Sequence, residues 1–187
     1  HERTAKLMAE VMAGQTPQAD AARDQRAMEF EYDTVIDSST YAIFAMEMFD
    51  VHDERVEKTM QAIANRLWVN TTVGGIARYE NDYYHRISDD IKAVPGNPWF
   101  ICTLWLAQWH IAKAKTVEEL SLAMPILDWA ANHALPSGVL AEQVHPETNS
   151  PLSVSPLTWS HATVVATLTS YLRKYRAMTA CPSCGQS

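Results

Sequence analysis

The segment that begins at Asp53, DERVEKTMQAIANRLW, has the strongest structural pattern in this sequence. Val56, Met60, Ile63 and Leu67 recur every three or four positions, which is the spacing of one face of an α-helix, and charged residues lie opposite. Asp53 stands where a side chain accepts hydrogen bonds from the first helical turn. The segment therefore predicts an amphipathic helix that must bury one stripe against other elements.

The neighbouring segments are also helical in pattern. Residues 38–49, SSTYAIFAMEMF, are apolar nearly all round behind an Asp-Ser-Ser start, so they predict a buried helix joined to the amphipathic one as an αα-hairpin. A second hairpin is predicted from a helix over about residues 98–115 and a segment capped by Thr116 and Glu119, which have the spacing of a capping box. Pro125 predicts a kink or break in that last segment.

The final periodic segment, HATVVATLTSYLRKY, contains many β-branched residues, which favour a strand. Val164, Leu168, Tyr171 and Tyr175 nevertheless keep helical spacing over its whole length. Length and period together predict a helix.

Length and composition are consistent with one helical domain. The chain has 187 residues, of which 47% are hydrophobic, and this is enough for a substantial core. An all-α fold is predicted, with a domain over residues 1–178, including a short amphipathic helix over 2–13, and a polar tail over 179–187. The tail contains a single CPSC motif, which without a second cysteine pair is an ordinary tail rather than a zinc site.

Charge and hydropathy exclude several classes of partner. The net charge is -7, from 15 basic and 22 acidic residues, and this argues against nucleic acid or an anionic membrane. The longest apolar run, residues 99–107, is far shorter than the roughly 20 residues that span a bilayer. Three cysteines make no disulfide framework and Cys102 is expected in the core, so the cellular location stays unknown, with a cytoplasmic one favoured.

Two long polar loops, residues 73–97 and 135–156, interrupt the helical pattern, and loops of this length are often functional. The first contains RYENDYYHR, in which Arg78 and Asp82 lie four positions apart. This pair is either a solvated ion pair or an arginine that a carboxylate aims at ligand hydroxyl groups. Composition alone favours the ion pair.

The second loop contains GVLAEQVHPE, in which Glu142 is a candidate to activate water, and Trp159 follows seventeen positions later as a candidate sugar platform. Glu142 and His145 also have a spacing found in metal sites. A loop imposes no helical geometry on that spacing and a third ligand is missing, so no metal site is predicted. His145 and Glu147 are interpreted as turn and surface residues.

Taken in order, RYENDYY, GNPWFICTLWLAQW and GVLAEQVHPETNSPLSVSPLTWSHA strongly resemble motifs of glycoside hydrolase family 15, which includes glucoamylases, glucodextranases and trehalases. The match runs over about residues 37–175. The resemblance implies an (α/α)6 barrel of helical hairpins, of which this chain supplies roughly the C-terminal half. It also implies inverting hydrolysis of α-glucosidic bonds without a cofactor.

The resemblance implies roles for individual residues. Glu142 matches the catalytic base that activates water, and Arg78 matches the arginine that contacts the sugar at the scissile bond. Asp82 matches the acidic residue that supports the arginine. Trp159 matches a tryptophan that lines the site, and Trp99 a motif tryptophan near it. The implied partner is an α-glucoside or α-glucan, with starch-like glucan, dextran and trehalose all left open.

The sequence departs from the family pattern in two places. The family's general acid belongs to a run of acidic residues in an earlier loop, and Glu118 and Glu119 stand in a capping context instead. Extra residues also lie between Tyr84 and Pro95. The chain is therefore expected to require the missing N-terminal half of the barrel, or an equivalent, and to be inactive alone. The alternative is a non-catalytic glucoamylase-like module for sugar binding or regulation.

Overall fold

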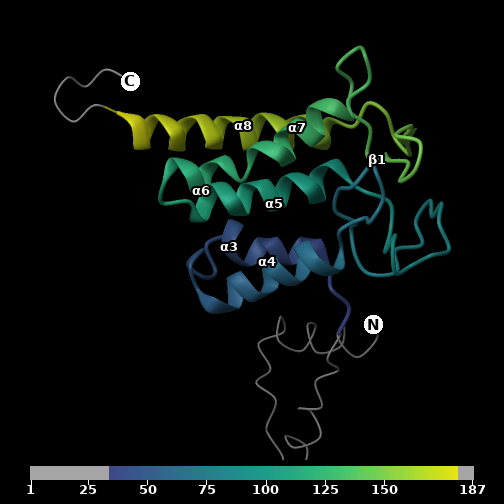
Figure 1. The fold of residues 1–187 in the computed structure, drawn as a ribbon, viewed down its shortest axis with the longest axis horizontal. Helices are drawn as coiled ribbons and strands as arrows, with labels where there is room; N and C mark the ends of the chain where they lie inside the picture. The colour runs from purple at the N-terminus through teal and green to yellow at the C-terminus, as the bar shows by residue number, and fades with distance from the viewer. Residues whose placement is uncertain (1–33, 181–187) are drawn as a thin grey trace, which may run out of the picture. The chain divides into compact units, whose positions relative to one another are not determined.

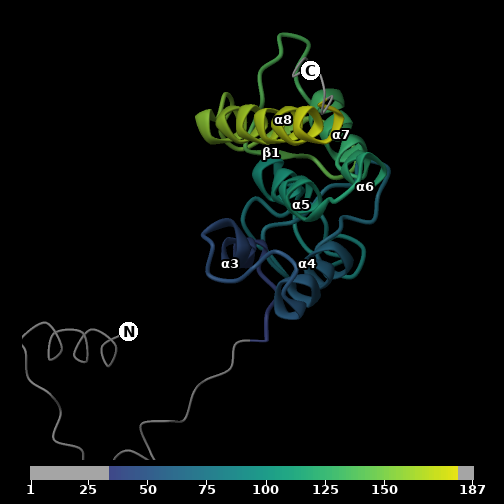
Figure 2. The same cartoon turned by 90° about the vertical axis from the view of Figure 1, so that its left-hand side faces the viewer.

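The computed structural model describes residues 34–180, so the helix expected over residues 2–13 and the CPSC tail lie outside the described residues. The described part is all-α apart from one small hairpin, as the sequence predicts. Its elements in chain order are η1 (Ser38–Tyr41), α3 (Ala42–Ala45), α4 (Glu54–Arg66), α5 (Phe100–Lys113), α6 (Val117–Ser121), α7 (Met124–Asn132), β1 (Gln143–Val144), β2 (Pro151–Leu152) and α8 (Thr158–Thr179). Figures 1 and 2 show α5 between α4 and α8.

Helix α4 confirms the amphipathic prediction. The Asp53 carboxylate accepts a hydrogen bond from the backbone N–H of Arg55, and the helix begins at the next residue after Asp53. The predicted stripe is buried to the last residue, and each of its side chains is at most 1% exposed: Val56, Met60, Ile63 and Leu67. Periodicity alone therefore located this face of the core.

Helix α5 is the centre of the core, since α4, α7 and α8 all pack against it. Its side chains are buried on nearly every side, which explains why its sequence is apolar without a clear stripe. The buried residues are Phe100, Ile101, Cys102, Thr103, Leu104, Trp105, Leu106, Ala107, Trp109 and Ile111.

The segment after α5 is divided into two helices, as Pro125 predicts. Thr116 caps α6 by accepting a hydrogen bond from the Glu119 N–H at 3.2 Å, and the Glu119 carboxylate accepts one from the Lys115 N–H at 2.6 Å. Pro125 lies in the first turn of α7, where its missing N–H removes no helical hydrogen bond. A second helix start is therefore the least disruptive position for this proline.

The prediction of a buried helix over residues 38–49 is wrong in length and in burial. The helical part ends at Ala45, because Glu47 adopts a left-handed backbone with φ of 57° and turns the chain. Met46 and Met48 are 69% and 65% exposed, whereas Phe44 packs against the core. Only one side of this segment meets α4 and α5, so its apolar composition overstated its burial.

Helix α8 is confirmed, and it begins three residues earlier than its periodic pattern. Two of the residues that carry this pattern are exposed. Leu168 and Tyr175 are each 42% exposed. The buried face carries small hydroxyl side chains instead, namely Ser160, Thr163 and Thr167. Short side chains on this face let α8 approach α5 closely, and that choice of face depends on the partner helix.

The described residues contain no helix that is both long and apolar enough to cross a membrane.

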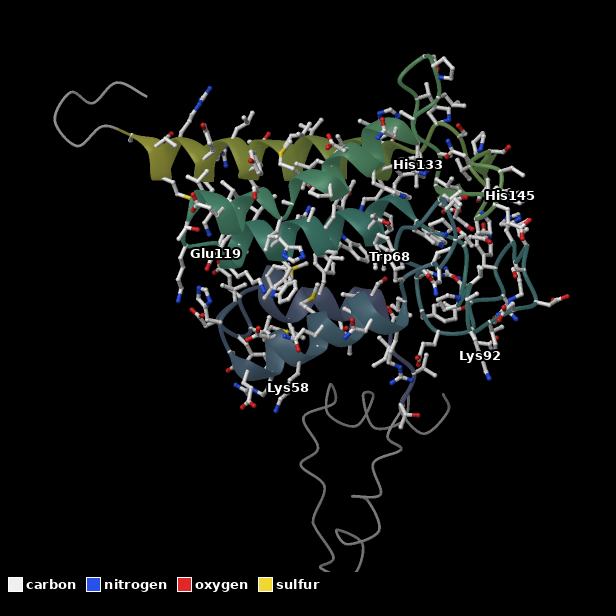
Figure 3. The ribbon with its side chains drawn as sticks, viewed as in Figure 1. Lys58, Trp68, Lys92, Glu119, His133 and His145 are labelled. Atoms are coloured by element: carbon white, nitrogen blue, oxygen red, sulfur yellow. The ribbon has the colours of Figure 1, made fainter. Side chains whose placement is uncertain are left out.

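Both long loops lie at the same end of the helices, beyond the N-terminus of α5 (Figure 1). The loop over 135–156 is not wholly irregular, because β1 and β2 pair antiparallel, with Gln143 opposite Leu152. Isolated bridges join Ala77 to Pro98 and Trp99 to Gln143. In Figure 3, Lys92 of the first loop and His145 of the second both lie at this end. The backbone therefore brings the two candidate loops together.

Candidate active site

Arg78 and Asp82 form a bidentate ion pair in the first loop. The Arg78 Nε donates to Asp82 Oδ2 at 3.0 Å, and Nη2 donates to Oδ1 at 2.9 Å. Asp82 is 1% exposed, whereas the Arg78 side chain is 34% exposed. The carboxylate is thus buried below the guanidinium, and the pair is not the solvated surface pair that composition favours.

Three aromatic rings surround the Arg78 guanidinium. Its central carbon lies 4.8 Å from the Tyr79 ring centroid, 5.3 Å from that of Tyr84 and 4.9 Å from that of Trp99. Such contacts are favourable for a cation over a ring face. Burial by itself lowers the pKa of Arg78, but the hydrogen bonds and charge of Asp82 outweigh burial and raise it. The arginine is therefore a fixed, permanently charged donor.

Tyr84 also belongs to this site, although no individual role was predicted for it from the sequence. Its backbone N–H donates to Asp82 Oδ1 at 2.9 Å, and its hydroxyl lies 3.5 Å from the Ser153 hydroxyl of the second loop. The available signal was its position two residues after Asp82, where a carboxylate can accept a bond from the backbone.

Trp99 lies under the arginine rather than in the open. Its side chain is 4% exposed, and its backbone pairs with Gln143 immediately before α5. The buried Trp99 ring thus packs against the Arg78 guanidinium, and the Trp99 backbone connects the first loop to Gln143, the residue after Glu142.

Glu142 is held by its backbone at the edge of β1. Its N–H donates to Val154 O at 2.8 Å, and its carbonyl accepts a bond of 3.4 Å from the Phe100 N–H. Its side chain is partly exposed, with Oε2 3.4 Å from Gln143 Nε2. A carboxylate with a pinned backbone and solvent access has the arrangement that a general base requires.

Trp159 lies in the first turn of α8 and is 55% exposed. Its ring centroid is 6.0 Å from that of Trp105, which stacks at 4.1 Å on Tyr41. The next residue, Ser160, donates to Ala141 O at 2.7 Å, directly before Glu142. This bond anchors the start of α8 to the segment that carries the candidate base.

The remaining polar candidates have structural positions. His145 Nδ1 accepts bonds from the N–H groups of Glu147 and Thr148 at 3.2 and 3.3 Å, so it stabilises a turn, as predicted. Within residues 34–180, no group of three His, Cys, Asp or Glu side chains is arranged to hold a metal ion. Glu119 caps α6 and lies away from the loop end (Figure 3).

Comparison with known proteins relates this chain to glycosidases. The family model for glycosyl hydrolases of family 15 matches residues 110–169. An uncharacterized glycosyl hydrolase of Methanocaldococcus jannaschii is 33% identical over 140 residues, which cover 70% of this chain and 21% of that protein. A bacterial glucoamylase solved in complex with acarbose matches the structure with a TM-score of 0.62 and 25% identity, over 75% of this chain and 21% of that one. The chain is therefore similar to one segment of family 15 glycosyl hydrolases, glucoamylase among them.

These matches confirm the resemblance and the fold class: the glucoamylase-like helical hairpins form part of an (α/α)6 barrel. The chain spans about a fifth of the length of each relative. The family match includes Glu142 and Trp159. The structure joins Arg78, Asp82 and Trp99 in one cluster, and the Trp99 backbone pairs with Gln143, the residue after Glu142.

Proposed function

We propose that this glucoamylase-like segment carries one side of the active site of an inverting α-glucosidase, with Glu142 as the general base. The observation that supports this most strongly is the backbone bridge between Trp99 and Gln143. This bridge joins the residue after Glu142 to Trp99, whose ring centroid lies 4.9 Å from the Arg78 guanidinium carbon, in a segment similar to a glucoamylase.

In an inverting reaction, a carboxylate removes a proton from water, which attacks the anomeric carbon on the face opposite the leaving oxygen. A carboxylic acid roughly 6.5–9.5 Å away protonates that oxygen as the glycosidic bond breaks. Glu142 supplies the first group. The second is expected from another part of the longer protein, because no residue of this chain matches the family's acid motif.

Arg78 and Trp159 are proposed to hold the sugar. Within residues 34–180, Asp82 and Tyr79 engage Nε and Nη2 of Arg78, and Nη1 has no hydrogen bond, so it remains a donor for a glucose hydroxyl group. The exposed indole of Trp159 offers a flat apolar surface to the face of a sugar ring. The proposed substrate is an α-glucoside or α-glucan.

The outer face of α8 supports the expectation that further barrel segments pack against this chain. Val165, Leu168, Leu172 and Tyr175 recur at helical spacing and are 64%, 42%, 51% and 42% exposed. A continuous apolar face of this kind marks a surface that another element covers. The rest of the barrel is the proposed partner.

The test is the variant Glu142→Gln in the complete protein. Release of glucose from maltose should fall by about a hundredfold to ten thousandfold, the contribution of a general base. Acarbose binding, measured by calorimetry, should persist. The exposed Glu147→Gln in the same loop is the matched control and should retain activity.

Two results would contradict the proposal. Near-normal turnover by Glu142→Gln would remove its role as base. Release of α-glucose rather than β-glucose, observed by proton NMR before mutarotation, would exclude inversion. A wild-type protein that binds acarbose but hydrolyses no α-glucoside would instead support the non-catalytic module.

A further inference from the structure

Two buried amide side chains connect the first loop to Glu142. Asn97 is 2% exposed and Gln143 is 0% exposed. Asn97 Nδ2 donates to the His85 carbonyl at 2.8 Å and to Gln143 Oε1 at 2.9 Å. Gln143 Nε2 then donates to Glu142 Oε2 at 3.4 Å. A continuous chain of hydrogen bonds thus runs from a backbone carbonyl to the proposed base.

The two ends of this chain determine the orientation of both amides. The His85 carbonyl only accepts hydrogen bonds, so it holds the NH2 group of Asn97. Gln143 must therefore turn its oxygen toward Asn97 and its NH2 group toward Glu142. An ionised Glu142 carboxylate also only accepts, so it agrees with this orientation. Turning Asn97 would place its oxygen against the His85 carbonyl oxygen. Turning Gln143 would place its oxygen against the Glu142 carboxylate.

The other end of the chain is the loop that holds the arginine. His85 has a left-handed backbone with φ of 52°, which fixes the direction of the loop here. Arg86 follows, and its Nε and Nη2 donate to the Asp82 carbonyl at 3.2 and 3.0 Å. The segment from Asp82 to Arg86 therefore positions both the Arg78 partner and the first acceptor of the amide chain.

We propose that Asn97 and Gln143 are positioning residues that orient the Glu142 carboxylate toward the attacking water and couple it to the arginine loop. The inference rests on the proposed function, because it requires Glu142 to be the base. Burying two amides is costly compared with an apolar pair of similar size, so a role in orientation accounts for their presence. The 3.4 Å bond to Glu142 is long, as catalytic hydrogen bonds often are before a substrate is bound.

The experiment uses α-glucosyl fluoride and azide with the complete protein. In water, Glu142 takes a proton from the nucleophile, the new C–O bond forms on the β face, and fluoride leaves with the electron pair of the C–F bond. In Glu142→Ala, azide needs no base, and its nitrogen forms the C–N bond of β-glucosyl azide as fluoride leaves. The rate of the azide reaction therefore depends on substrate binding and on the departure of fluoride, but not on proton removal by the base.

Gln143→Met and Asn97→Asp are each made with Glu142 present and in the Glu142→Ala background. Methionine keeps the length of Gln143 without its hydrogen bonds. An aspartate in place of Asn97 removes both of its donors, so Gln143 turns its NH2 group away from Glu142. With Glu142 present, kcat in water should fall roughly ten- to a hundredfold at unchanged KM, as expected for a lost hydrogen bond to a charged group. In Glu142→Ala with azide, neither change should slow the reaction further.

Asn149→Asp makes the same chemical change as Asn97→Asp at an exposed loop position and should alter neither rate. Equal slowing of the water and azide reactions would show a general distortion and overturn the inference, as would unchanged kcat in both variants. If Asn97→Asp does not fold, Gln143→Met carries the test. Wild-type turnover by Glu142→Ala in water would refute the proposed function as well. A large loss of turnover in Glu142→Ala, together with wild-type kcat in Gln143→Met and Asn97→Asp, would refute only the inference.

Discussion

Gly96 is the position where one added methyl group should damage the sugar site most directly. A Cβ atom there would lie 2.8 Å from the Asp82 Cβ and 3.3 Å from the Ala77 Cβ. The Gly96 backbone lies outside the left-handed region, so an alanine meets a steric problem and not a conformational one. Asp82 is buried, and its N–H donates to the Pro95 carbonyl at 2.9 Å, so it has little room to move.

The expected magnitude follows from these contacts. Overpacking a buried site by one methyl group costs about 1–3 kcal/mol. To relieve the contact, the two Cβ atoms must separate from 2.8 Å to at least 3.4 Å. This movement strains the hydrogen bonds of 3.0 and 2.9 Å that the Asp82 carboxylate accepts from Arg78. Loss of one hydrogen bond to a charged group corresponds to about 1.5–3 kcal/mol, so KM for an α-glucoside should rise about tenfold or more.

The assay combines steady-state kinetics on maltose with denaturant unfolding. Gly138→Ala is the matched control, because Gly138 has φ of 80° and open space around it. It should lose about 1–2 kcal/mol of stability from the left-handed backbone alone, with KM unchanged. If Gly96→Ala loses stability but keeps the wild-type KM, then the pair of Arg78 and Asp82 does not contribute to sugar binding.

Three further predictions concern single side chains. Trp159→Ala should weaken acarbose binding, measured by calorimetry, with little loss of thermal stability. Trp105 is buried, so Trp105→Ala should cost about 3–5 kcal/mol of stability. Equal destabilisation by the two changes would contradict the exposed position of Trp159. Burial, and then the charge of Lys113, lower the pKa of His110 to about 4. As the pH falls from about 6.5 to 4, the His110 imidazole takes up a proton in the unfolded state but not in the folded state, so the free energy of unfolding should decrease. Denaturant unfolding at several pH values should show a smaller decrease in His110→Gln. Burial raises the pKa of the Cys102 thiol to about 12, so peptide mapping after iodoacetamide treatment at pH 8 should find this residue modified only in unfolded protein.

The sequence was sufficient for features that depend on neighbours along the chain. The stripe and cap of α4, the capping of α6 by Thr116 and the helix break at Pro125 all follow from contacts within one or two turns. Resemblance to family motifs then pointed to Glu142 and Arg78. The comparisons support this resemblance and the structural match confirms the fold class, while the roles of these residues stay predictions.

Tertiary structure decided what depends on the partner of an element. Which face of α8 is buried could not be read from its sequence, because the close approach of α5 favours hydroxyl side chains over the larger apolar stripe. The contact from Asn97 to Gln143 joins residues 46 positions apart, and only the pairing of two loops brings these amides together. Local periodicity therefore determined the helices, whereas long-range packing determined how the loop of Arg78 comes to pair with the segment that contains Glu142.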